Sequence, residues 1–147
     1  MKLKLVQDRI VKALEADEWF RKFAIPVVAE DQGDVSAMLQ AALVKARRGV
    51  LVQTTGFTAS SSASKVMVGE AAVAVQALER IPENRKNGGP SAQDIAEVVA
   101  WRLNLLPLDG VGTLVFRKIE SDMLDDGRTL SYVATFAVQT TLGNPLD

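Results

Sequence analysis

Apolar residues recur at intervals of three and four in three stretches of the chain, and this spacing predicts three amphipathic helices. Asp34 stands where its carboxylate can cap the second helix, and Gly49 is expected to close that helix in a left-handed conformation. The third helix begins with the S-x-x-D capping pattern formed by Ser91 and Asp94. The helices are expected over Leu3–Phe20, Asp34–Arg48 and Ser91–Leu106.

Elsewhere the apolar period changes to two, which predicts strands. Two long strands flank the polar segment 58–64, and Gly69 marks the expected position of a bulge in the second of them. The last two strands are joined by a turn that contains Asp126-Gly127, a strong hairpin signal. Both faces of the final strand are partly apolar, so we expect it to be covered on both sides of its sheet or to cover a partner. The strands are expected over Ile25–Ala29, Val50–Phe57, Val66–Ile81, Thr113–Met123 and Thr129–Thr141.

The order of these elements is α-β-α-β-β-α-β-β, and it predicts the α+β class. We expect a mainly antiparallel sheet with the helices packed on one face. The chain of 147 residues has the length of one ordinary domain. It contains no internal repeat and no segment with the composition of a linker, so residues 1–147 are expected to form a single domain.

Composition narrows the chemistry that the chain can perform. It contains no cysteine and no histidine, which excludes disulfides, thiol chemistry, and Ser-His or Cys-His nucleophile pairs. Lys and Arg number 17 against 18 Asp and Glu, so the chain lacks the basic excess of proteins that grip nucleic acid by its phosphates. The N-terminus has no signal-peptide pattern, and no window approaches the roughly 20 apolar residues of a membrane span. We therefore expect a soluble cytoplasmic protein.

The remaining candidates for catalysis are weak. Carboxylates cluster near the last hairpin and could share a proton or hold a divalent cation, but acidic residues are also ordinary turn formers, which is the interpretation we favour. The Ser-rich segment 58–64 with Lys65 lacks the S-x-x-K and G-x-S-x-G frames of serine nucleophiles and is better interpreted as a flexible hairpin tip. We expect no enzymatic activity, no cofactor and no metal. The clustered carboxylates are Glu120, Asp122, Asp125 and Asp126.

Basic and aromatic residues offer two further kinds of contact. Trp19, Phe20 and Trp101 are expected to pack within the protein rather than to stack on bases. Two basic groups could contact a phosphate backbone or an acidic partner, although the first of them equally suits the negative end of a helix. These groups are Lys45, Arg47 and Arg48, and Arg80, Arg85 and Lys86.

In size and in the order of its elements, the chain resembles the tail-terminator, or tail-completion, proteins of long-tailed bacteriophages and prophages. The segment from Ser91 to Ala100, SAQDIAEVVA, resembles the helix that these proteins place between their two strand pairs. The helix expected over Asp34–Arg48 is longer than in many members. The stretches that carry the resemblance are Leu3–Phe20, Ile25–Ala29, Val50–Phe57 with Val66–Ile81, Ser91–Leu106 and Leu114–Thr141.

The resemblance implies a hexameric ring that stops polymerisation of the tail tube and forms the docking surface for the head. The implied partners are further copies of the chain, the tail tube protein and the head-tail connector. DNA would pass through the lumen without specific binding, and no membrane is involved. The protein would be a virion component assembled in the host cytoplasm. A ring requires a heterologous contact that closes, and strand edges pairing between subunits could supply it.

Three other functions stay open at this point. The chain could be another head-tail connector or head-completion protein, a small ferredoxin-like ligand-binding or regulatory domain, or a histidine-free enzyme that uses Asp122, Asp125 or Asp126. Under the ring hypothesis, subunit and partner contacts are expected at loop tips and basic groups. The expected contact residues are Lys45, Arg47, Arg48, Phe57, Thr58, Ser60, Ser61, Ser62, Lys65, Arg85, Lys86, Asp125 and Asp126.

Overall fold

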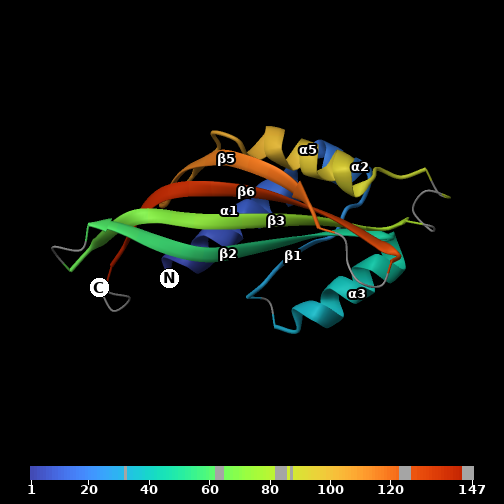
Figure 1. Cartoon of the computed structure of the whole chain (residues 1–147), viewed down its shortest axis with the longest axis horizontal. Coiled ribbons are helices and arrows are strands. Elements are labelled where there is room, and N and C mark those ends of the chain that lie inside the picture. The colour runs from blue at the N-terminus through green and yellow to red at the C-terminus, as the bar shows by residue number, and fades with distance from the viewer. Residues whose placement is uncertain (32, 62–64, 82–85, 87, 123–126, 144–147) are drawn as a thin grey trace.

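A curled, mostly antiparallel sheet of six strands organises the computed structural model, which describes residues 1–31, 33–61, 65–81, 86, 88–122 and 127–143 (Figure 1). The strands lie in the order β1-β2-β3-β6-β5-β4. The predicted α+β class and element order are confirmed. The helices are α1 (Lys2–Ala16), α2 (Glu18–Lys22), α3 (Val35–Ala46) and α5 (Ala92–Leu103). The strands are β1 (Val27–Ala29), β2 (Arg48–Ser61), β3 (Met67–Arg80), β4 (Pro107–Leu108), β5 (Gly112–Ser121) and β6 (Thr129–Leu142).

Three long antiparallel strands form the centre of the sheet. β3 pairs with β6 along its whole length, from Met67 opposite Leu142 to Arg80 opposite Thr129. β2 lies on the other side of β3, and the short strand β1 joins β2 in parallel. The short strands β1 and β4 leave most of the outer edges of β2 and β5 without a paired strand among the described residues.

The main core lies between one face of this sheet and the helices α1, α2 and α5. Alternate residues of the central strands, such as Val50, Val75 and Phe136, face the apolar stripes of α1 and α5. Ile10 of α1 and Ile95 of α5 are fully buried in the same cluster. On this face, the apolar residues that alternate along the strands therefore pack against the apolar stripes of the helices, as the sequence predicted.

Helix α3 departs from the predicted arrangement because it packs on the opposite face of the sheet. A Cβ atom placed on Gly49 would lie 3.5 Å from Cβ of Ala42 and 3.8 Å from Cδ1 of Leu39, both on α3. Since Gly49 precedes Val50 in β2, the two residues face opposite sides of the sheet, and Val50 belongs to the main core. The two distances at Gly49 are ordinary van der Waals distances, so α3 lies directly against the second face of the sheet.

Several local features differ from the sequence-based expectation. The first predicted helix is broken at Asp17, whose carboxylate accepts hydrogen bonds from the N–H groups of Trp19 and Phe20 and so starts α2. Arg47, and not Gly49, takes the left-handed conformation that ends α3, with φ of 65°. The side chain of Asp34 caps α3 as predicted.

One predicted local signal is confirmed, and a second is found on the neighbouring strand. Ser91 and Asp94 form the reciprocal capping box at the start of α5. The bulge predicted at Gly69 lies instead on the partner strand, because the extra residue falls between Ala59 and Ser61 of β2, opposite Gly69 and Val68. A Cβ on Gly69 would collide with the carbonyl oxygen of Thr58, so only glycine fits this approach. Among the described residues, no helix is long and apolar enough to span a membrane.

Candidate assembly surfaces

The hairpin of β2 and β3, flanked by the end of β6, projects past the helical layer at one end of the molecule (Figure 1). We call residues 55–61, 65–70 and 139–143 the arm. The predicted contact residues Thr58, Ser60, Ser61 and Lys65 are exposed on it, and Phe57 is half-buried. Ser62, also predicted as a contact, lies outside the described residues. Exposed apolar residues of the arm were not singled out from the sequence; they are Val66, Met67 and Val68.

The outer edge of β2 is blocked near its middle by a carboxylate. Beyond β1, the N–H of Glu30 donates to the carbonyl oxygen of Val52 over 3.1 Å, and Oε1 of Glu30 accepts from the N–H of Thr54 at 3.1 Å. Gln7 of α1 donates to the same Oε1 at 2.8 Å and holds the carboxylate in place. From residue 55 onward, no strand among the described residues covers this edge of β2, which makes it available for pairing with another chain.

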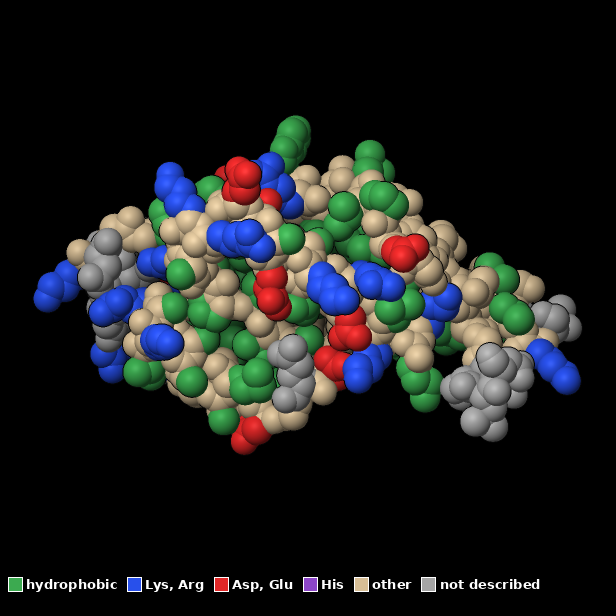
Figure 2. All heavy atoms as spheres, turned by 180° about the vertical axis from the view of Figure 1, so that it is seen from behind, with side chains coloured by type: hydrophobic (Ala, Val, Ile, Leu, Met, Phe, Trp, Pro, Cys, Tyr) green, Lys and Arg blue, Asp and Glu red, His purple; other side chains and the backbone are tan. Residues whose placement is uncertain are grey.

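The end of the sheet opposite the arm is rich in basic side chains. The structure brings together residues from the two basic groups of the sequence, because the N–H of Arg80 donates to the carbonyl oxygen of Arg47 at 2.9 Å. Lys45 and Lys86 are exposed, while Arg85 lies outside the described residues. Figure 2 shows basic side chains gathering toward this end, whereas acidic and basic groups are interspersed over the middle of the same side.

Arg48 is a correction to the predicted contact surface, because it is buried, with 8% of its surface exposed. Its Nη1 donates to the carbonyl oxygen of Phe23 at 3.3 Å. It lies opposite the fully buried Glu79 in the β2–β3 pair. Burial lowers the pKa of the Arg48 guanidinium, the Glu79 carboxylate opposes this by raising it, and the charge of Arg47 lowers it further. Arg48 therefore serves the fold and not an exposed contact.

Glu79 connects this buried charge to the helical layer. Its Oε1 accepts a hydrogen bond from the N–H of Ala92 at 3.0 Å, in the first turn of α5. An acidic group at the start of a helix satisfies a free N–H and complements the helix dipole. Through Glu79 and Arg48, the ends of β2 and β3 are thus tied to both α5 and the segment after α2.

Trp101 is a second correction, because it does not pack within the protein. Its side chain on α5 is 80% exposed. Leu105, four residues later, is 65% exposed and has a left-handed backbone with φ of 63°. Trp19 and Phe20 do pack as predicted, with their ring centroids 5.7 Å apart in an edge-on arrangement. We call Trp101 and Leu105 the corner.

The candidate acidic residues do not assemble into a described site. Glu120 is exposed and forms an ion pair with Lys118 at 2.9 Å, and Asp122 is exposed at the end of β5. Asp125 and Asp126 lie outside the described residues. Within the described part of the chain, no group of three or more carboxylates is placed to hold a metal ion.

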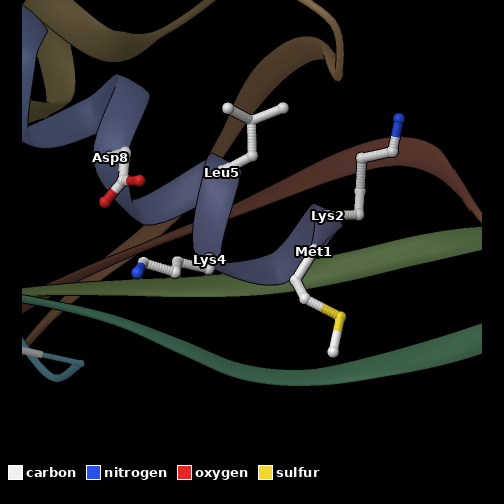
Figure 3. A pocket seen from close by; sticks show the side chains of 5 residues that line it. All are labelled: Met1, Lys2, Lys4, Leu5 and Asp8. Carbon is white, nitrogen blue, oxygen red and sulfur yellow. The ribbon is translucent and has the colours of Figure 1, made fainter. Parts of the chain in front are cut away.

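Among the surface hollows that described residues line, two are considered as candidate binding sites. One, of about 290 Å³, is lined only by the first turns of α1, and Figure 3 shows its Met1 and Leu5 side chains pointing to opposite sides. The other, of about 430 Å³, lies where α2 and the start of α5 meet, with Trp19, Asp94 and Glu97 among its lining residues.

Comparison with known proteins gives a likeness of fold. No protein-family model matches the sequence, and no curated protein sequence matches it. A protein in the structure of the virion of a native gene transfer agent particle has a TM-score of 0.60 to this chain at 12% identity, covering 92% of this chain and 94% of the other. A second solved structure, of a protein without a descriptive name, has a TM-score of 0.51 at 12% identity and covers 94% and 97% of the two chains. The chain therefore shares its fold, along nearly its whole length, with a component of a gene transfer agent virion.

Proposed function

We propose that this chain is a structural virion protein that forms a ring at the end of a phage-type tail tube and joins the tube to the head. The observation that carries the proposal is the end-to-end likeness of fold to a component of a gene transfer agent virion. The resemblance of the element order to tail-terminator proteins supports it independently, because it was drawn from the residues alone. Neither likeness depends on a small shared motif, since both extend over nearly the whole chain.

The distribution of surface features supports a ring in particular. A ring needs two different patches on each copy, so that one patch meets the other patch on the next copy. The arm and the corner are two such patches, and each exposes large apolar side chains. The uncovered edge of β2 beyond Thr54 offers a further route to pairing between copies.

The charge pattern suits a channel for DNA. The net formal charge is -1, and acidic and basic groups are interspersed over the middle of the side shown in Figure 2. A lumen without a strong positive field would let the phosphate backbone pass without being held. In this role the chain needs neither catalysis nor a cofactor.

The proposed test is a tube-polymerisation assay with the tail tube protein of the same particle. Adding this protein to growing tubes should stop elongation at one end and give rings that cap the tubes in negative-stain images. A variant that lacks residues 60–64 should fold but cap poorly, because the hairpin tip at residues 58–64 is expected to contact the tube. Tubes that grow to the same lengths with and without the protein would contradict the terminator role, and binding to the connector alone would favour another neck protein.

A further inference from the structure

A stripe of exposed residues on α5 changes from acidic to apolar toward the end of the helix. Glu97 and Trp101 are four residues apart on α5, so they lie on one side of the helix, and Leu105 follows two residues after the helix ends at Leu103. Glu97 is exposed and forms no ion pair with another described residue. Trp101 and Leu105, together with Met1 and Val44, are the four most exposed large apolar residues of the described chain.

Leu105 combines exposure with backbone strain. A left-handed conformation costs a residue other than glycine roughly 1–2 kcal/mol. Its N–H donates to the carbonyl oxygen of Leu114 at 2.8 Å, and the side chain of the preceding Asn104 accepts from the N–H of Phe116 at 3.0 Å. These hydrogen bonds hold Leu105 in a strained backbone conformation with its side chain in solvent. The stability of the isolated chain does not require this arrangement.

The arm carries a basic residue followed by exposed apolar residues, which complements the acidic and apolar residues at the end of α5. Lys65 is exposed at the hairpin and is followed by Val66, Met67 and Val68, which are 44%, 40% and 44% exposed. Methionine adapts its shape to irregular partners and makes favourable contacts with aromatic rings. The arm is thus basic and then apolar, where the stripe on α5 is acidic and then apolar.

We propose, building on the ring described above, that the arm of one copy seats on the corner of the next copy. Met67, whose side chain faces the opposite side of β3 from that of Val68, covers Trp101 and Leu105, and Lys65 lies toward Glu97. The pairing removes both apolar patches from water and brings opposite charges together. Because arm and corner are different surfaces, the contact is heterologous and repeats from copy to copy, as a closed ring requires.

Trp101 should be the residue on which this contact depends most. Exposed aromatic anchors are typical hot spots of interfaces, and losing one weakens binding by about thirtyfold or more. Trp101→Ala should therefore raise the dissociation constant of the assembly by that factor. Val44→Ala is the matched control, because Val44 is 74% exposed on α3, on the other face of the sheet. This control should leave assembly unchanged.

The direct experiment places the photo-crosslinking residue p-benzoyl-phenylalanine at position 101, which keeps an aromatic side chain there. After irradiation of the assembled protein, the crosslinked peptides are identified by mass spectrometry. The contact predicts crosslinks to residues 65–70 of another copy. Crosslinks to any other region or to another virion protein, or assembly that is unaffected by Trp101→Ala, would overturn the contact while leaving the ring intact. A wild-type chain that stays monomeric at every concentration overturns the ring itself and this contact with it.

Discussion

Replacing Glu79 with alanine should destabilise the protein strongly, because Glu79 is a buried charge that contacts α5 and faces Arg48. Its carboxylate accepts from the N–H of Ala92 and faces Arg48 across the β2–β3 pair. It is completely buried, and Arg48 is nearly so. The substitution leaves the guanidinium of Arg48 in the interior without its counter-charge and the N–H of Ala92 without its acceptor.

The size of the effect follows from these two losses. Removing one member of a buried ion pair typically costs about 3–5 kcal/mol, because the other charge stays buried and uncompensated. For a chain of this length, such a loss lowers the melting temperature by about 6–20 °C. Glu79→Gln should cost less, because an amide oxygen can still accept from Ala92 although the charge is lost. Replacing both residues, with Glu79→Leu and Arg48→Met, should cost less than the sum of the single changes.

Urea unfolding followed by circular dichroism measures these differences directly. All variants are compared at one protein concentration, because association between copies would add to the apparent stability. A Glu79→Ala variant whose free energy of unfolding lies within about 0.5 kcal/mol of the wild type would refute the reasoning, since that is the range of ordinary surface substitutions. Strict additivity of the double replacement would show that the two charges do not interact.

Three further substitutions test other parts of the structure. Gly69→Ala should destabilise the arm by about 1–3 kcal/mol, because its Cβ would collide with backbone, whereas Gly56→Ala meets nothing within 4 Å and should be nearly neutral; hydrogen exchange of the arm amides compares the two. Leu105→Asn should stabilise the monomer by up to about 1 kcal/mol by relieving left-handed strain, yet weaken assembly; a thermal shift without loss of assembly would contradict its place in the corner. Ser91→Ala removes half of the capping box of α5 and should cost about 0.5–2 kcal/mol in urea unfolding, and an unchanged midpoint would show that the cap contributes nothing.

Local signals in the sequence predicted most of the fold. The reciprocal cap of Ser91 and Asp94 and the carboxylate cap of Asp34 act within one helical turn, so the residues that make them are visible in sequence. The position of α3 depends on tertiary contacts and was missed. A signal for it existed, because Val50 and Leu51 are both apolar, and a strand with two apolar faces needs cover on both.

The assembly surfaces were less predictable because exposure depends on distant residues. Arg48 follows a helix end, where arginine is normally exposed, but here it is buried opposite Glu79 of another strand, which offers a counter-charge. Trp101 was expected to pack because aromatic residues usually do. It is, however, out of phase with the buried stripe of Ile95, Val99 and Leu103, and this mismatch was the signal that it faces outward.

The central claim is that copies of this chain close into a ring. Light scattering of the purified protein over a range of concentrations, followed by negative-stain imaging of the largest species, tests that claim most directly. The account predicts a closed hexameric ring with a central hole, whose population rises with concentration and falls in Trp101→Ala but not in Val44→Ala. A compact dimer without a hole, or a monomer at every concentration, would contradict it.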